Sequence, residues 1–401
     1  MRTILFVKKY LLLLPLILVV FVGSLVYTST SGNKINNSKD LNGDTVLELP
    51  KNGISPTLKL CIKDSDQRRC FTNYFNYAIG KYSSKDLANQ LYYYRTAVPT
   101  ATQYCHDQAL SIGIQAWGEY KDLDKVLEFG TPVCASGFLH GVQEAVGLDL
   151  AIPTETLVSL VSKVCSEITN DDFKDSNYRV CYHGIGHAVA KRTSNDIEKG
   201  MEICATLDAT KPKTNPFDAS YTKRELCSEG LSMRFFESIV LDVTKDATLP
   251  KKGVLTINEN PYQICDKQKD LSLRYGCFEY GTRAFTHTDL DYNRTAMLCN
   301  LYKKIDQVPC YFGISREVAY TAETDTFTNV TEICSQANDP DASYICGMNA
   351  IMNRITIDNN ITAPLEICGR LPKNAVNKRI CTYVKDHLVI TSSENERNIN
   401  K

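Results

Sequence analysis

The stretch that decides the fold of this chain is Cys181-Tyr182-His183-Gly184-Ile185-Gly186-His187-Ala188. It indicates the start of a helix in which a glycine follows the cysteine after three positions and a polar side chain follows after six. The same cysteine–glycine frame recurs along the chain: Cys134 with Gly137 and His140, Cys227 with Gly230 and Met233, Cys310 with Gly313 and Arg316, and Cys277 with Gly281, one position late, and Arg283. Cys346 and Cys381 keep the sixth position as Met352 and His387, but have Asn349 and Val384 in place of the glycine. Such recurrence predicts a repeat protein.

The composition argues against some classes of function. The 401 residues include 45 Lys and Arg against 46 Asp and Glu, which gives a formal net charge of −1. This balance predicts no basic face for nucleic acid. The chain has 16 cysteines and no Cys-x-x-Cys pair of the kind that zinc ribbons use. The cysteines therefore predict disulfides, formed in an oxidising compartment.

The N-terminus predicts a membrane anchor. Arg2, Lys8 and Lys9 precede an apolar run over residues 11–27, close to the shortest length that spans a bilayer. Positive charge ahead of the run places residues 1–10 in the cytoplasm and sends the rest of the chain outward. Because no Ala-x-Ala-like cleavage site follows, we expect an uncleaved signal anchor in the cell membrane, crossing it once. A cleaved signal peptide is the alternative.

The rest of the chain divides by composition. Residues 28–55 are rich in small, polar and charged side chains, which predicts a flexible tether. Residues 391–401 predict a disordered tail. All of the cysteines lie within residues 56–390, which we expect to form the folded array.

The cysteines sort into neighbouring pairs along this array. In each pair, we expect the first cysteine to end one helix and the second to open the next. The predicted disulfides are Cys61–Cys70, Cys105–Cys134, Cys165–Cys181, Cys204–Cys227, Cys265–Cys277, Cys299–Cys310, Cys334–Cys346 and Cys368–Cys381. Segments such as residues 157–165 have apolar residues three and four positions apart, as helices do. The predicted fold is all-α: an α-solenoid of helical hairpins with disulfides between successive hairpins, preceded by one transmembrane helix.

The predicted unit resembles a known family of repeats. A cysteine that ends one helix, a gap of about a dozen residues and a cysteine that opens the next helix look like the secreted, disulfide-stapled branch of the tetratricopeptide-like helical repeats. The resemblance covers most of residues 58–390. It implies stacked helical hairpins with a concave surface.

The recurring glycine predicts close packing between helices. It lies one turn after the cysteine, on the same helix face. A glycine inside a helix costs about 1 kcal/mol of helix propensity, so a close approach by another helix would offset that cost. The alternative is that glycine is merely tolerated near a helix start.

A polar stripe follows the same frame. Positions two, six and ten after each cysteine share a second helix face. These positions hold Ser136, His140, Glu144, His183, His187, Lys191, Glu229, Met233, Glu237, Glu279, Arg283, His287, Phe312, Arg316, Tyr320, Met348, Met352 and Thr356. Five of the six histidines lie on this stripe, the fifth being His387. We expect the stripe to line the concave surface as a groove.

Three interpretations of this stripe remain open. The first is a binding groove for a protein, a peptide or a cell-wall glycan. The second is a zinc or copper site at His140, His183 and His187, with Glu144 or Glu229 beside them and Met233 as a softer ligand for copper. The third is a set of buried polar residues that hydrogen-bond neighbouring helices.

Enzymatic activity has the least support. The sequence has no Gly-x-Ser-x-Gly elbow, no phosphate-binding glycine loop and no His-Glu-x-x-His motif. His140 and Glu144, four positions apart, are the pair that could transfer protons. No cofactor is indicated apart from the alternative metal ion.

Overall fold

The computed structural model describes residues 47–98, 100–101, 104–130, 134, 136–167, 174–208, 221–243, 260–286, 292–321, 332–358, 378–382 and 385. Within these residues the chain is helical and contains no strand, so the predicted all-α class is confirmed. The predicted cytoplasmic segment, signal anchor, most of the tether and the tail lie outside them. None of the helices in the described part is both long enough and apolar enough to cross a membrane.

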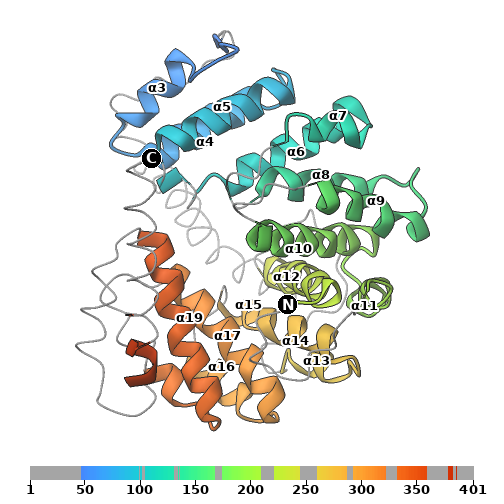
Figure 1. Cartoon of the computed structure of the whole chain (residues 1–401), viewed down its shortest axis with the longest axis vertical. Helices are drawn as coiled ribbons and strands as arrows, with labels where there is room; N and C mark the ends of the chain where they lie inside the picture. Colours follow the sequence, from blue (N-terminus) through green and yellow to red (C-terminus); the bar gives the residue numbers. More distant parts are fainter. Residues whose placement is uncertain are drawn as a thin grey trace, which may run out of the picture.

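A series of long helices organises the structure. Each packs against the next one along the chain, in a curved row that runs from α6 to α19 (Figure 1). These long helices are α6 (His106–Tyr120), α8 (Gly137–Leu148), α10 (Lys174–Arg192), α12 (Lys223–Val243), α14 (Leu271–Gly281), α17 (Lys304–Thr321) and α19 (Pro340–Asp358).

The other helices connect and flank this row. The chain enters it through α3 (Pro56–Ile62), α4 (Gln67–Ala78) and α5 (Ser84–Ala97). The helices between the long ones are α7 (Leu123–Leu127), α9 (Thr154–Glu167), α11 (Ile197–Cys204), α13 (Gln263–Asp266), α15 (Arg283–Thr286) and α16 (Tyr292–Cys299). Of these, α7, α9, α11 and α13 lie along the outer side of the curve in Figure 1.

Seven of the predicted disulfides are confirmed. They are Cys61–Cys70, Cys105–Cys134, Cys165–Cys181, Cys204–Cys227, Cys265–Cys277, Cys299–Cys310 and Cys334–Cys346. Cys381 is also disulfide-bonded, and its predicted partner Cys368 lies outside the described residues. From Cys165 onward, each bond joins one of the flanking helices, or the helical residues 332–335, to the long helix that follows.

The predicted helix starts need correction. α10 begins at Lys174 and α12 at Lys223, so Cys181 and Cys227 lie inside helices that have already started. At Cys105 the order is reversed, because this cysteine precedes α6 instead of ending a helix. α6 is an additional long helix, with no cysteine of its own inside it, and the spacing of the cysteines could not reveal it.

Most of the frame glycines lie where consecutive long helices touch, as predicted. A Cβ on Gly230 of α12 would collide with the carbonyl oxygen of His183 on α10, and one on Gly186 of α10 would collide with that of Cys227 on α12. A Cβ would collide with a backbone carbonyl oxygen at Gly137 and Gly313 as well, and with side chains at Gly184 and Gly281. Backbone therefore packs directly on backbone at Gly137, Gly230 and Gly313, and the interpretation of the frame glycines as merely tolerated near a helix start is wrong.

The two glycines of α6 allow this packing to be tested. A Cβ on Gly113 would collide with the carbonyl oxygen of Phe138, whereas one on Gly118 would meet no atom within 4 Å. Gly113→Ala should lower the free energy of unfolding by about 1–3 kcal/mol through overpacking. Gly118→Ala should raise it by up to about 1 kcal/mol through helix propensity. Urea unfolding with the disulfides intact measures both, and equal effects would contradict this account.

Candidate functional site

Most of the predicted stripe is buried. His140, Glu144, His183, His187, Glu229, Glu279 and Arg316 are each at most 9% exposed, and Met233, Glu237 and Arg283 are half-buried. The expectation that these seven residues line an open groove is therefore wrong. His287 and His387 lie outside the described residues, and the structure does not describe the side chains of Tyr320, Met352 and Thr356.

The buried stripe residues belong to a series of glutamate and arginine side chains that alternate along a path of ion pairs. Glu144 of α8 accepts a hydrogen bond from Nη2 of Arg234 on α12. Arg234 Nη1 lies 3.1 Å from Oε2 of Glu237. The other oxygen of Glu237, Oε1, accepts a hydrogen bond from Arg283 Nη1. Arg283 Nε then donates to Oε1 of Glu317 on α17 at 3.0 Å. These contacts join α8, α12, α15 and α17.

The chain of charges continues back toward α10. Arg316 Nε donates to Glu317 Oε1 at 3.1 Å, and its Nη1 donates to Glu279 Oε1 at 2.7 Å. Glu279, on α14, also accepts from Arg179 Nη2 at 3.2 Å. The same Nη2 lies 3.5 Å from Oε2 of Glu229 on α12. Consecutive long helices are thus joined by ion pairs as well as by backbone contact.

Two histidines of α10 close this chain into a ring. His183 Nδ1 is 3.6 Å from Glu229 Oε2, and the rings of His183 and His187 have centroids 4.9 Å apart. His187 Nδ1 lies 3.0 Å from Glu144 Oε1, to which it donates because a carboxylate only accepts. We call this set the charged ring: Glu144, Arg234, Glu237, Arg283, Glu317, Arg316, Glu279, Arg179, Glu229, His183 and His187.

The charges of the ring balance once Lys191 is counted with it. Five glutamates face four arginines, and Lys191 of α10 adds a fifth cation 3.5 Å from Oε2 of Glu144. Buried ions cost several kcal/mol each in lost hydration unless they are paired. Arg316 also lies with its Cζ 3.7 Å from the centroid of the Tyr280 ring, a cation–π contact that holds it in place.

The histidines in and beside the ring are held neutral. Burial lowers the pKa values of His140, His183 and His187 well below the usual 6.5, and nearby arginines lower them further. His140 Nε2 donates to the carbonyl oxygen of Val180 at 2.9 Å. Glu317, by contrast, is held in its charged form. Burial raises its pKa, but the neighbouring Arg283 and Arg316 outweigh burial, so its pKa is lowered.

The predicted metal site is not formed. The His140 ring lies 5.8 Å from that of His183 and 5.0 Å from that of His187, so the sequence did predict this cluster of three. However, no group of three or more His, Cys, Asp or Glu side chains in the described part of the chain could hold a metal ion. His187 donates one nitrogen to Glu144, and the surrounding guanidinium groups repel a cation. The prediction of zinc or copper at His140, His183 and His187 is therefore wrong for this arrangement.

The ring has a layered distribution of charge. The side chains of Glu144, Glu229 and Glu279 are at most 2% exposed. The cations reach further out: the exposed fraction is 34% for Arg179, 31% for Lys191, 24% for Arg234 and 19% for Arg283. We call these four residues the cationic edge. Arg179, Lys191 and Arg234 are held by the buried Glu144, Glu229 and Glu279, whereas Arg283 pairs with Glu317, which is 6% exposed, and with Glu237, which is 19% exposed.

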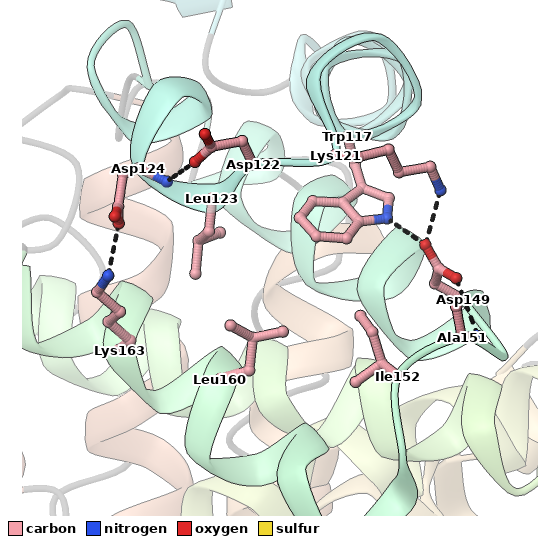
Figure 2. Close-up of a pocket in the computed structure, with 10 residues that line it drawn as sticks. All are labelled: Trp117, Lys121, Asp122, Leu123, Asp124, Asp149, Ala151, Ile152, Leu160 and Lys163. Carbon is pink, nitrogen blue, oxygen red and sulfur yellow. Dashed lines mark hydrogen bonds and ion pairs between the residues drawn. The ribbon is translucent and has the colours of Figure 1, made fainter.

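A second candidate is an open cleft of about 730 Å³ between the α6–α7 and α8–α9 hairpins (Figure 2). Its floor includes Trp117 and Leu160. Lys163 pairs with Asp124 at 2.6 Å at one end, and Asp149 binds Lys121 at 2.7 Å and the indole nitrogen of Trp117 at 3.1 Å at the other. The cleft is lined by Trp117, Lys121, Asp122, Leu123, Asp124, Asp149, Ala151, Ile152, Leu160 and Lys163. Both lysines already pair with acids, so the cleft is the weaker candidate.

Sequence reasoning missed several members of the ring. Arg179, Arg234 and Glu317 lie outside the positions of the stripe. Arg234 and Glu317 share one frame position, seven residues after Cys227 and Cys310, which is not among positions two, six and ten. Arg179 lies two residues before Cys181, ahead of the frame. Glu144 also pairs with His187 and not with His140. His187 is only 1% exposed, so a substrate could not reach this acid–base pair in the folded chain.

Removing one carboxylate should unbalance the ring. Glu279→Gln takes the negative charge away from both Arg179 and Arg316, so the free energy of unfolding should fall by about 3–5 kcal/mol. The matched control is Glu198→Gln, which removes the carboxylate of the exposed Glu198–Lys267 pair, 3.2 Å apart. It should change stability little, because exposed pairs contribute little. Urea unfolding compares the two, and equal effects would argue against a buried network.

The buried histidines predict a dependence of stability on pH. Their folded-state pKa values lie below the unfolded value of about 6.5, so the unfolded chain binds more protons as the pH falls below that value. Stability should therefore decline between about pH 7 and pH 5, by up to about 1.4 kcal/mol per pH unit for each such histidine. His183→Gln should make the decline shallower. Urea midpoints across this window test the prediction, and a flat profile would contradict it.

Comparison with known proteins found no relative whose function could be compared with that of this chain. No protein-family profile matches the chain, and neither a curated protein nor a solved structure is significantly similar to it. The resemblance to disulfide-stapled tetratricopeptide-like repeats stays a prediction. Any function therefore has to be argued from the charged ring and its cationic edge.

Proposed function

We propose that this protein is an extracytoplasmic binding scaffold, held in the cell membrane by residues 11–27. In this proposal the long helices form an α-solenoid, and the solenoid presents the cationic edge to a protein, a peptide or a cell-wall glycan. The observation that carries the proposal is the layering of the charged ring, in which partly exposed cations lie above buried carboxylates.

The disulfides support the proposed compartment. Seven bonds tie consecutive helices together, and such bonds form and persist outside the reducing cytoplasm. The apolar run at residues 11–27, with Arg2, Lys8 and Lys9 ahead of it, would direct the chain across the membrane and hold it there. Both features agree on an array outside the cell.

The packing supports a rigid scaffold. Each long helix contacts the next one along the chain, as the repeats of a solenoid do. Glycines bring the backbones of these helices together, and disulfides join the intervening helices to them. Side chains held on such a frame keep their geometry before a partner arrives, which lowers the entropic cost of binding.

The cationic edge supports binding rather than stability alone. Arginine is over-represented in the energetically important parts of interfaces. Replacing a buried ion network with apolar side chains is often neutral or even stabilising, so stability by itself is a weak reason to keep one. A network that holds several cations at the surface of a rigid frame has a use in recognition.

Site-specific crosslinking in intact cells tests this proposal. A photo-crosslinking residue at Lys191, on the cationic edge, should form an adduct with a second macromolecule. The matched control is the same residue at Lys267, whose side chain is 66% exposed on the α13 side, away from the ring. An adduct at Lys191 and none at Lys267 would support the proposal. No adduct at Lys191, or equal adducts at both positions, would overturn it.

A further inference from the structure

We propose that Arg179 is the anchor of a carboxylate-binding site, which takes an acidic side chain of an extended peptide. This inference rests on the proposed binding function and names the chemistry of the partner. It is carried by three observations: the way Arg179 is held, the donors it leaves available and the aromatic rings beside it.

One nitrogen of Arg179 ties its side chain to two buried glutamates. Nη2 makes both carboxylate contacts, at 3.2 Å to Glu279 and at 3.5 Å to Glu229. The side chains of these glutamates are 0% and 1% exposed, whereas that of Arg179 is 34% exposed. Glu279 is itself held by Arg316 at 2.7 Å. The guanidinium group of Arg179 is therefore tied to the interior while part of it reaches solvent.

The remaining donors of Arg179 are available to a ligand. Within the described part of the chain, Nε and Nη1 have no hydrogen-bond partner. Lys191, on the same helix, is 31% exposed and contacts only Glu144, at 3.5 Å, in that part of the chain. Since these exposed groups only donate hydrogen bonds, a ligand must offer acceptor oxygens. An ionised oxygen accepts such bonds more strongly than a neutral one.

Aromatic rings orient the guanidinium group. The Cζ atom of Arg179 lies 4.3 Å from the ring centroid of Tyr221 and 5.9 Å from that of Phe312. Cation–π contacts of this kind attract the guanidinium group to the rings and so favour one position of the group before binding. Phe312 and Tyr221 are both half-buried, which leaves part of each ring for apolar atoms of a peptide next to its carboxylate.

The local field favours an anion of low charge. Besides burial, four arginines lower the pKa of His183: Arg179, Arg316, Arg283 and Arg234. Glu229 Oε2, 3.6 Å from His183 Nδ1, acts in the opposite direction, and the charges of the ring balance together with Lys191. A phosphate dianion would also meet Glu229, which shares Nη2 with Glu279. A single carboxylate fits the donors that Arg179 still has.

Peptide binding to the full chain, with its disulfides intact, tests the inference. We expect a fluorescent hexaglutamate peptide to bind at least about tenfold more tightly than hexaglutamine, as measured by anisotropy, since hydrogen bonds to charged groups are worth about that much. Arg179→Gln should remove this preference, and Arg179→Lys should keep part of it. Lys267→Gln, at an exposed cation away from the ring, is the matched control and should leave it unchanged.

The outcomes separate this inference from the proposed function. Equal binding of the two peptides to the unaltered chain would overturn the carboxylate site, even if Arg179→Gln did not fold. Full retention of the preference by a folded Arg179→Gln variant, checked by circular dichroism, would overturn the role of Arg179. Displacement of hexaglutamate by tripolyphosphate at lower concentration than by unlabelled hexaglutamate would overturn the choice of carboxylate. If Lys191 forms a crosslink to a partner while hexaglutamate and hexaglutamine bind equally, the carboxylate site is rejected and the proposed binding function stands.

Discussion

The structure depends on direct backbone contact between consecutive long helices. At Gly186 and Gly230, where α10 crosses α12, the absence of a side chain lets each backbone reach the carbonyl groups of the other helix. The same contact recurs between α6 and α8 through Gly113 and Gly141. Glycine weakens each helix by about 1 kcal/mol, and close packing returns that free energy as dispersion contacts. The disulfides then limit how far neighbouring helices can separate.

Close packing explains why the interior charges form a ring. Helices that touch along their backbones leave little room for water, so the buried glutamates need partners from the chain itself. Each arginine in the ring binds two glutamates, so no ion pair stands alone: Arg234 contacts Glu144 and Glu237, and Arg316 contacts Glu317 and Glu279. Because several of these pairs join different helices, such as Arg234 of α12 with Glu144 of α8, the ring also restrains how the helices lie against one another. The N-terminal helices α4 and α5 differ, since aromatic residues such as Phe71, Phe75 and Tyr94 fill their contact.

The same arrangement links stability to recognition. Buried carboxylates cannot bind a ligand from solvent, but they can hold arginines whose side chains are partly exposed, such as Arg179 and Arg234. Arg179 shows this division most clearly, with Nη2 directed to Glu229 and Glu279 and with Tyr221 stacked on its guanidinium group. The neutral histidines, by contrast, keep additional positive charge out of the ring.

The amino-acid sequence by itself determined the helical class, seven of the disulfides and the close approach at the frame glycines. These features depend on residues that recur at fixed spacing, and spacing along one helix is a local property. Only the tertiary structure decided that His140, Glu144 and Glu229 are buried rather than exposed along a groove, because burial depends on the neighbouring helices. It also decided the pairing of Glu144 with His187 and Arg234, and the place of Arg179. Such contacts join residues 43 to 100 positions apart, and a position within one repeat does not tell which residue of another helix lies opposite.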